Sequence, residues 1–404
     1  MKLKILFFLF IMILLSSCHK QKSPNKIYKI PFWFLTSNLL YQINIFSLLI
    51  LSIILPLSSC TKEKKCFNGE ITIFDLPQKV DTLKIDEHLV FDGFYTGDLY
   101  TYDSVIFFKS PMYITHYINA YSLNSKEQTG IFFLKGNGHN EVIQCVPASD
   151  IFLSGNEIKM WMLIENRELA IFNISKSLEH RTTILDTITI DIRMSHPKIF
   201  LFALDSSQYL IKTKIQEFYN NTHSDFIPGE YLLFKTNTDS IEKSYTLFNR
   251  GIINNEITKS KEIYYSSFDK LKPDKSMVAM AMSIMPQINI LDLNTGELKG
   301  FKHKNISDYR YLKGRVSDFI FYYRSINVDN DYIYTAYVNS PYNKGMGATE
   351  QTHFIHIYDW EGNFIRQLYL EKAFFVFKVN TKTKKILTID LNDNVYSYDL
   401  NLPV

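Results

Sequence analysis

Residues 289–298 read NILDLNTGEL, and this stretch decides the fold. Ile290 and Leu291 belong to a short apolar run that predicts a buried β-strand. The polar residues that follow include Gly296, and a tight hairpin turn needs glycine where φ becomes positive. The segment WEGN at 360–363 repeats this arrangement. Both stretches therefore predict two antiparallel strands joined by a short turn.

The pattern recurs along the chain in six copies. Each copy has a short apolar strand with an aromatic residue or leucine near its end, then a polar residue, then a turn. The copies read AYSLNSKEQTG around Tyr121, AIFNISKSLEH around Phe172, LLFKTNTDS around Phe234, NILDLNTGEL around Leu291, HIYDWEGNFI around Tyr358 and YSYDLN around Tyr398. About 57 residues per copy suffice for a four-stranded blade, and radial repetition of blades protects strand edges. The sequence therefore predicts an all-β fold, a six-bladed β-propeller of four-stranded antiparallel blades.

Composition agrees with a fold built from sheets. Aromatic residues make up 15% of the 404 residues, with 31 phenylalanines and 26 tyrosines, and such side chains suit cross-strand pairs. After residue 66, no segment keeps a convincing 3.6-residue apolar stripe over three helical turns. Residues 206–220 come closest, and they are typical either of a strand pair or of a short helix.

The last copy of the pattern has one strand too few. Three strands are expected there, over 374–379, 386–390 and 395–400. The missing fourth strand is predicted to come from the N-terminal end, at 71–76, which begins with Ile-Thr-Ile-Phe. Pairing of this strand with the last blade would close the ring.

Two copies of Leu-Ser-Ser-Cys end apolar runs near the start of the chain, at Cys18 and Cys60. Lys2 and Lys4 precede the first run, and small residues precede each cysteine, as in a secretory signal. Both copies resemble the bacterial lipobox, whose cysteine thiol is diacylated before the preceding peptide is removed, and two acyl chains anchor a protein stably. A second interpretation of the apolar run over 39–57 is a transmembrane helix.

Cys60 is the preferred lipidation site, and Cys18 is the alternative. A chain that began at Cys18 would keep the second apolar run, which would then need to be buried or inserted. A chain that begins at Cys60 passes through a few polar residues into the first expected strand. The predicted organisation is therefore a signal region over 1–60, a tether over 61–66 and a propeller domain over 67–404.

The net charge of the chain limits the classes of partner that are expected. Residues 1–60 hold six lysines and no acidic residue, so the remaining chain has 44 − 6 = 38 basic and 41 acidic residues, a net charge of −3. A nearly neutral domain without a basic block argues against a nucleic-acid partner.

These features together resemble the TolB-like six-bladed β-propeller lipoproteins. The resemblance rests on the lipobox, the tether, the six blade patterns, FLKGNGHNE at 133–141 and YDWEGNF at 358–364. Relatives tend to have Pro and Glu where this chain has His139 and Asn140. The resemblance implies a propeller fold and a lipid-anchored address in the bacterial cell envelope. It supplies no catalytic residue, and a fold alone does not set a function.

The outer membrane is the expected address within the envelope. Neither candidate cysteine is followed by Asp, the residue associated with inner-membrane retention in some lipoproteins.

Histidines are the natural candidates for metal ligands, but they are scattered. His353 and His356 lie three residues apart, which points them to opposite faces of a strand. Loops of a propeller can bring single residues to its central mouth, and the other candidates are His88, His116, His139, His196 and His303. Ordinary surface and strand histidines account for the same pattern, so no metal, cofactor or catalytic residue is predicted.

Three further features have structural interpretations. The Gly-Asn-Gly segment at 136–138 lacks the Lys-Ser/Thr of a phosphate-binding loop and predicts a turn. Cys66 and Cys145 are candidates for a disulfide in an oxidising compartment. Several tyrosines offer either a platform for a glycan or peptide or packing between blades, namely Tyr322, Tyr323, Tyr337 and Tyr342.

Two functional classes remain. The favoured one is a non-enzymatic, membrane-anchored binding or scaffold protein, whose propeller face or long loops receive a protein or glycan partner. Residues 327–351 are the longest expected flexible loop. The alternative is a propeller lyase or hydrolase with a metal at the central mouth.

Overall fold

The computed structural model describes twelve stretches of the chain between residues 66 and 400. They are 66–76, 79–93, 95, 97–138, 141–165, 168–191, 198–213, 230–236, 240–249, 266–304, 319–341 and 351–400. Residues 65–404 form one compact unit. Residues 342–350 of the predicted loop 327–351 lie outside the described residues, as do the candidate residues Cys18, Cys60, His139, His196 and Tyr342.

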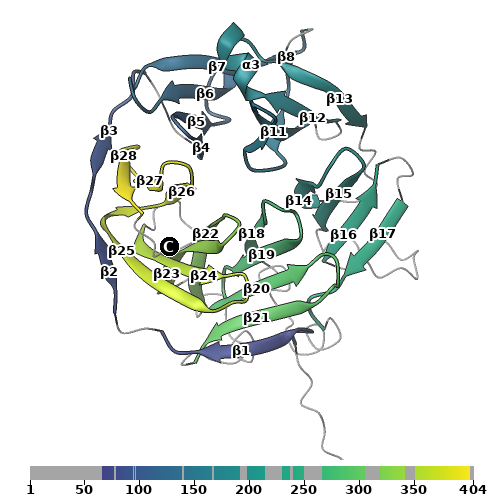
Figure 1. Ribbon diagram of the computed structural model, residues 1–404, viewed down its shortest axis with the longest axis vertical. Helices are drawn as coiled ribbons and strands as arrows, with labels where there is room; N and C mark the ends of the chain where they lie inside the picture. The colour runs from purple at the N-terminus through teal and green to yellow at the C-terminus, as the bar shows by residue number, and fades with distance from the viewer. Residues whose placement is uncertain are drawn as a thin grey trace, which may run out of the picture. The chain divides into compact units, whose positions relative to one another are not determined.

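Six small sheets form a ring, and we number them as blades 1 to 6 in chain order (Figure 1). Blade 1 contains β4 (Asp98–Tyr102), β5 (Val105–Lys109), β6 (His116–Ser122), β7 (Gln128–Lys135) and β8 (Glu141–Val142). Blade 2 contains β9 (Cys145–Pro147), β10 (Phe152–Ser154), β11 (Glu157–Ile164), β12 (Glu168–Asn173) and β13 (Leu185–Asp191). Blade 3 contains β14 (Lys198–Ala203), β15 (Gln208–Thr213), β16 (Tyr231–Lys235) and β17 (Ser240–Tyr245).

The other three blades each include one strand from the N-terminal part of the domain. Blade 4 contains β18 (Ser267–Leu271), β19 (Met277–Met282), β20 (Gln287–Asp292), β21 (Leu298–His303) and β1 (Glu70–Phe74). Blade 5 contains β22 (Ile320–Val328), β23 (Tyr332–Pro341), β24 (Thr352–Asp359), β25 (Phe364–Phe374) and β2 (Asp81–Leu83). Blade 6 contains β26 (Val376–Asn380), β27 (Lys385–Ile389), β28 (Val395–Asp399) and β3 (Glu87–Leu89).

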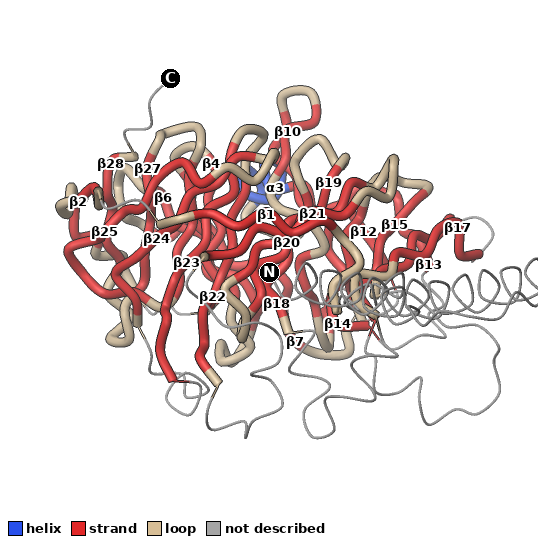
Figure 2. Tube along the Cα trace, turned by 90° about the horizontal axis from the view of Figure 1, so that it is seen from below, coloured by secondary structure: helices blue, strands red, loops and turns tan. Residues whose placement is uncertain are grey.

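The predicted six-bladed β-propeller is confirmed, with blades of four or five strands in place of four throughout. Each of the six sequence patterns lies on the third strand of a different blade: β6, β12, β16, β20, β24 and β28. Pairing inside the blades is antiparallel, except that β1, β2 and β8 pair in parallel with β21, β25 and β7. Figure 2 shows the β10–β11 hairpin projecting from one side of the ring.

The turns after the third strands explain why the pattern contains a polar residue and a glycine. In blade 4, Asp292 Oδ1 accepts hydrogen bonds from the backbone N–H groups of Asn294 and Thr295, at 2.8 and 2.9 Å. This is the local bonding that makes aspartate a turn residue. Gly296 and Gly362 then adopt positive φ, at 77° and 90°, as the hairpin prediction requires.

The N-terminal segment 66–89 runs around the outside of the ring, and we call it the outer belt. It begins beside blade 3, where Asn68 N–H donates to Leu247 O (2.8 Å), and continues as β1 on blade 4, β2 on blade 5 and β3 on blade 6. Inside the ring, Asn380 Nδ2 donates to Thr101 Oγ1 (2.9 Å), which joins the first strands of blades 6 and 1. The outer belt is therefore hydrogen-bonded to four blades before the chain enters blade 1.

The segment that closes the last blade differs from the prediction. Residues 71–76 do not complete blade 6, because residues 70–74 pair with β21 of blade 4 and bring the Phe74 ring within 5.0 Å of the His303 ring. The fourth strand of blade 6 is β3 (Glu87–Leu89), antiparallel to β28. The prediction that this strand comes from the N-terminal end is confirmed. The predicted segment was wrong, because β1 and β2 pair with blades 4 and 5 before β3 reaches blade 6.

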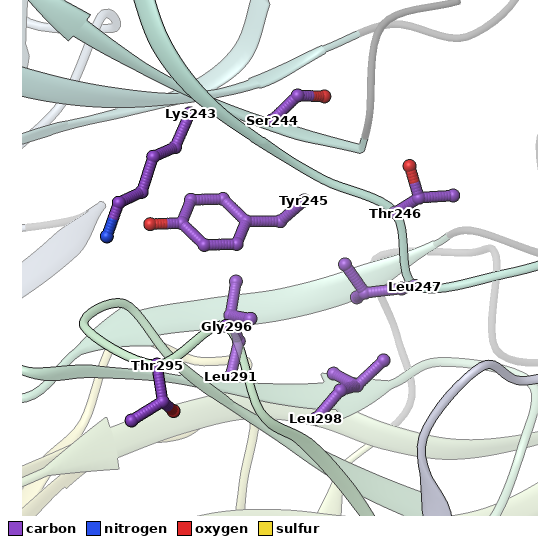
Figure 3. Close-up of a pocket in the computed structure, with 9 residues that line it drawn as sticks. All are labelled: Lys243, Ser244, Tyr245, Thr246, Leu247, Leu291, Thr295, Gly296 and Leu298. Atoms are coloured by element: carbon purple, nitrogen blue, oxygen red, sulfur yellow. The ribbon is translucent and has the colours of Figure 1, made fainter.

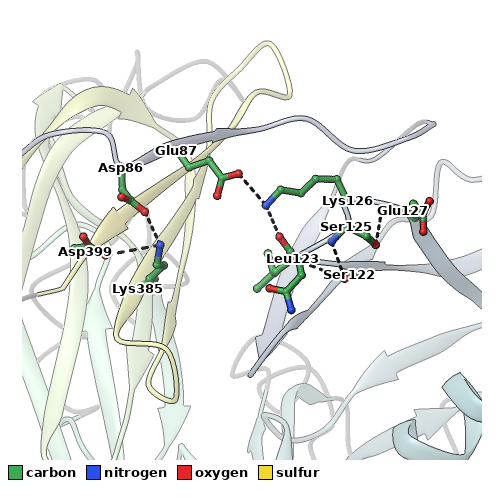
Figure 4. A network of polar contacts seen from close by, with 10 residues as sticks. Asp86, Glu87, Ser122, Leu123, Ser125, Lys126, Glu127, Lys385 and Asp399 are labelled. Atoms are coloured by element: carbon green, nitrogen blue, oxygen red, sulfur yellow. Dashed lines mark hydrogen bonds and ion pairs between the residues drawn. The ribbon is translucent and has the colours of Figure 1, made fainter.

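Ion pairs fix the end of the belt to the blades on either side of it (Figure 4). Lys385 of blade 6 bonds to Asp86, just before β3. Glu87 in β3 lies 3.0 Å from the ammonium of Lys126, in the turn between β6 and β7 of blade 1. The belt therefore bridges the junction between the last blade and the first.

One local prediction was wrong, and one short helix was not predicted. The expected loop 327–351 contains the long strand β23, whose residues Ile333 and Tyr334 are fully buried. A short helix, α3 (Ile174–His180), follows β12, and its N-cap residue Asn173 accepts a hydrogen bond from Lys176 N–H (3.1 Å). Seven residues make two helical turns, which is too short for an apolar stripe over three. The ambiguous segment 206–220 contains the strand β15 at 208–213.

Candidate functional site

The sequence-derived candidate residues do not form one site. Among those in the described residues, His88 lies on β3, His116 on β6 and His303 on β21, in three different blades. His353 stacks on Tyr369 with ring centroids 4.9 Å apart. His356, three residues later on β24, is fully buried on the other face of the strand.

Two of these histidines do come together in the core between blades 4 and 5. The ring centroids of His303 and His356 lie 5.6 Å apart, and the His356 ring stacks on Tyr337 at 4.1 Å. Tyr323 Oη lies 3.3 Å from His303 Nε2 and 3.0 Å from Tyr358 Oη. Burial lowers the pKa of His303 to about 4 and that of His356 well below its ordinary value, so both rings are neutral at pH 7.

The tyrosines of the predicted platform that the structure describes belong to this core. Tyr322, Tyr323 and Tyr337 are at most 7% exposed. They pack between blades 4 and 5, which was the second of the two interpretations offered by the sequence. In the described stretches, no group of three or more His, Cys, Asp or Glu side chains is placed to hold a metal ion.

Cys66 and Cys145 are not joined by a disulfide. Cys145 is 2% exposed in the core between blades 1 and 2, where burial raises the pKa of its thiol to about 12. Cys66 packs at the start of the belt, against a different core cluster. The two residues are held in separate parts of the ring, which the sequence alone did not reveal. The Gly-Asn-Gly segment forms the predicted turn, where Gly138 N–H donates to the Glu141 carboxylate (2.8 Å).

A different group of side chains meets at the axis of the ring. Asp150 lies in the segment between β9 and β10 of blade 2, Lys270 on β18 of blade 4 and Lys378 on β26 of blade 6. These are alternate blades, so side chains that touch one another must do so across the centre. We call these three residues the axial cluster.

One carboxylate oxygen holds the axial cluster together. Asp150 Oδ1 accepts hydrogen bonds from Lys378 Nζ (2.7 Å) and Lys270 Nζ (3.0 Å). The side chains remain partly open to solvent, at 27% for Asp150, 26% for Lys270 and 12% for Lys378. A charged group that is only partly desolvated keeps donors and acceptors available to a ligand.

The electrostatics of the axial cluster reflect two cations around one anion. Burial by itself raises the pKa of the Asp150 carboxyl, but Lys270 and Lys378 outweigh burial and hold this pKa below its ordinary value. For Lys378, burial lowers the pKa of the ammonium and outweighs the attraction of Asp150. The Tyr100 ring of blade 1 lies 5.9 Å from Lys378 Nζ. The cluster therefore joins aromatic surface to an excess of positive charge.

Sequence reasoning missed the axial cluster entirely. Asp150 lies 120 residues from Lys270 and 228 residues from Lys378, and no motif surrounds any of them. The only usable signal was a lysine in the first expected strand of a blade, a position that faces the axis of a propeller. That signal required the blade register, which the sequence did not provide.

A groove of about 340 Å³ lies on the outer side of the ring between blades 3 and 4 (Figure 3). Lys243 and Tyr245 of β17 line one side, and Thr295, Gly296 and Leu298 line the other. Tyr245 Oη donates to Leu293 O (2.7 Å) and Lys243 Nζ donates to Asn294 O (3.1 Å). These bonds cross from one blade to the next, so the groove is a seam of the ring.

The family follows from the match of residues 98–382 to the model described as TolB-like 6-blade propeller-like. The chain belongs to this family. The match covers well over half of the TolB-like chain, from the first strand of blade 1 into blade 6. No curated protein is significantly similar to it in sequence.

The comparison with solved structures gives matches of low sequence identity to this TolB-like protein. A Bacteroides fragilis protein described as exported has 11% identity and a TM-score of 0.45, with 82% of this chain and 98% of that chain covered. A member of the DUF4221 family from Bacteroides vulgatus has 10% identity and a TM-score of 0.45, with 81% and 96% covered. In the stretches that the structure describes, no helix has the length and apolar character needed to cross a membrane.

Proposed function

We propose that this TolB-like protein is a lipoprotein of the bacterial cell envelope, held by its lipid anchor in the outer membrane, and that its propeller is a non-enzymatic binding or scaffold module for a protein or glycan partner. The axial cluster carries the binding half of the proposal. It gathers charged side chains from three blades at the point where all blades meet, and it leaves them partly open to solvent. Charged groups that converge in a partly desolvated site are typical of ligand sites.

The lipobox patterns support the envelope half of the proposal. Cys60 is our preferred acylation site and Cys18 is the alternative. A lipid anchor would hold the propeller at a membrane surface, because two acyl chains bind a bilayer stably.

The anchor is tested by replacing each cysteine in the full chain. Cells that express wild type, Cys60→Ala or Cys18→Ala are labelled with a palmitate analogue and separated into soluble, inner-membrane and outer-membrane fractions. We expect Cys60→Ala to lose the label and to be absent from the outer-membrane fraction, and Cys18→Ala to behave as wild type. The opposite result would move the anchor to Cys18, and absence of the label from the wild-type protein would refute the lipoprotein assignment.

Binding is tested in intact cells by chemical cross-linking followed by mass spectrometry, and on an array of surface glycans. We expect one discrete partner or glycan class to be captured by the wild-type chain and lost in the variant with both Lys270→Met and Lys378→Met. Absence of any saturable partner in both assays would contradict a binding module.

A further inference from the structure

The axial cluster contains two lysines that already bind a carboxylate. Both ammonium groups donate to Asp150 Oδ1, at 2.7 and 3.0 Å, which are distances of charge-assisted hydrogen bonds. An ammonium has three N–H donors. Within the described residues, each of Lys270 and Lys378 has one hydrogen bond, the one to Asp150. Two donors on each lysine therefore remain for another acceptor.

The charge balance of the axial cluster favours an anion. Two cations share one carboxylate, so the local excess is one positive charge. In the part of the chain that the structure describes, Asp150 and Lys270 are the charged groups that influence the pKa of Lys378, and of these two only Asp150 is acidic. Partial burial strengthens such charges, because fewer water molecules screen them. The surrounding domain is nearly neutral, so the excess is a property of this place and not of the whole surface.

We propose that Lys270 and Lys378 form an anion-binding site that takes one carboxylate group of the ligand, beside Asp150. The inference rests on the proposed binding function and names its ligand chemistry. Asp150 plays two parts in this arrangement: it positions both ammonium groups at the axis, and its charge opposes the second carboxylate. The ligand's carboxylate uses the remaining N–H donors, and the Tyr100 ring near Lys378 provides apolar surface for the adjoining carbon atoms.

The opposed roles of Asp150 and the lysines provide the test. Binding of sodium D-glucuronate and of sodium N-acetyl-L-glutamate to the full chain in detergent micelles is measured by isothermal titration calorimetry, with D-glucose as the uncharged control. We expect saturable binding of at least one of the two anions and none of glucose. The glucuronate arm represents an acidic glycan and the glutamate arm an acidic peptide, so their relative affinities distinguish these two sources of the carboxylate.

The variants separate a ligand site from a structural one. Lys270→Met and Lys378→Met should each weaken anion binding by about tenfold or more, since a hydrogen bond to a charged group is lost. Asp150→Asn keeps the shape and removes the competing charge, so it should strengthen binding. Lys304→Met, which removes an exposed ion pair with Asp75, should bind as wild type. A site that only joins blades predicts no anion binding in any of these proteins.

Folding of each variant is checked by near-ultraviolet circular dichroism, and wild-type affinity is also measured at rising NaCl concentration, which should weaken it. Absence of saturable anion binding by wild type, or equal losses in Lys304→Met and Lys378→Met, would overturn the inference. A variant that binds neither anion but still captures the cross-linked partner would show that the axial cluster is not the site for that partner. This result would overturn the inference and leave the proposed binding function standing.

Discussion

The outer strand edges of blades 4 to 6 and those of blades 2 and 3 are protected in different ways. The outermost strands of the first group are paired with the belt strands β1, β2 and β3. In blades 2 and 3, β13 and β17 are the last strands of their sheets in the described part of the chain. The β17 edge carries charged residues, Glu242 and Lys243, which discourage pairing with another chain. The arc of blades 4 to 6 is therefore covered by the belt, and the β17 edge of blade 3 is protected by charge.

The two arcs differ in what joins neighbouring blades: backbone hydrogen bonds in one and side-chain contacts in the other. The belt joins blades 4, 5 and 6 through main-chain hydrogen bonds. Blade 3 is joined to blade 4 by buried side chains. The carboxylate of Asp269 on β18 forms an ion pair with Lys212 Nζ (2.8 Å) and accepts a hydrogen bond from Tyr231 Oη (2.5 Å). The side chains of Lys212 and Asp269 are 5% and 0% exposed. We therefore expect the junction between blades 3 and 4 to depend on side chains more than the belted arc does.

The largest effect is expected for Asp269→Ala. The change leaves the Lys212 ammonium buried without its carboxylate, which costs about 3–5 kcal/mol of the free energy of unfolding. Urea denaturation of the full chain measures this cost. Asp75→Ala is the matched control, because its ion pair with Lys304 is exposed and contributes about 0–1 kcal/mol. Equal costs for the two variants would mean that the belt alone holds the ring together.

The next largest effect tests the end of the belt. Leu89 in β3 is 2% exposed and packs against the core between blades 6 and 1, so Leu89→Ala should cost about 2–5 kcal/mol. Leu153→Ala on β10 is the control, since Leu153 is 57% exposed and lies outside the belted arc. Thermal unfolding followed by circular dichroism compares them. A loss for Leu89→Ala no larger than that for Leu153→Ala would show that β3 does not close the ring.

A smaller effect compares two glycines with positive φ, one in each arc. Gly362 in blade 5 has φ 90°, and a Cβ there would come within 1.9 Å of the Phe301 ring of blade 4. Gly155 in blade 2 has φ 61° and open space around it. Gly155→Ala should cost about 1–2 kcal/mol from the left-handed backbone alone, and Gly362→Ala should cost about 1–3 kcal/mol more from overpacking. Similar melting temperatures for the two variants would contradict close packing of blades 4 and 5.

The smallest effect concerns the buried histidines of the belted arc. The pKa of His303 is lowered to about 4 in the folded protein, so between about pH 6.5 and pH 4 the unfolded chain binds more protons. Stability is therefore lost as the pH falls through this window. At pH 5, His303 should account for about 1–2 kcal/mol of the loss relative to pH 7.

Urea titrations at pH 7 and pH 5 measure this dependence. His303→Phe should show a shallower loss of stability than wild type, and His180→Gln, which changes an exposed residue of α3, should follow wild type. A His303→Phe variant with the same pH dependence as wild type would place the sensitive groups elsewhere in the ring.

Much of the fold could be predicted, because its signals are local. A strand, a turn-forming aspartate and a glycine with positive φ lie within about ten residues of one another, as at 289–298. Two of the six patterns contain both the aspartate and the glycine, and the six patterns together counted the blades correctly. The helix α3 was missed because its two turns are too short for a periodic signal, and β23 was missed because turn-forming residues follow it closely.

The candidate site could not be predicted, because its residues meet only when the ring closes. Asp150, Lys270 and Lys378 come from alternate blades and carry no sequence pattern. The pairing of His303 with His356 and the separation of Cys66 from Cys145 likewise depend on which blades are neighbours.

The sequence by itself determined the strand period, the six strand patterns and hence the number of blades, because each depends on contacts between near neighbours in the chain. Only the tertiary structure decided which N-terminal strand completes blade 6, which blades the belt covers and which charges meet at the axis. Those outcomes depend on competition between distant segments for the same strand edges and the same central space, and no local pattern records the result of that competition.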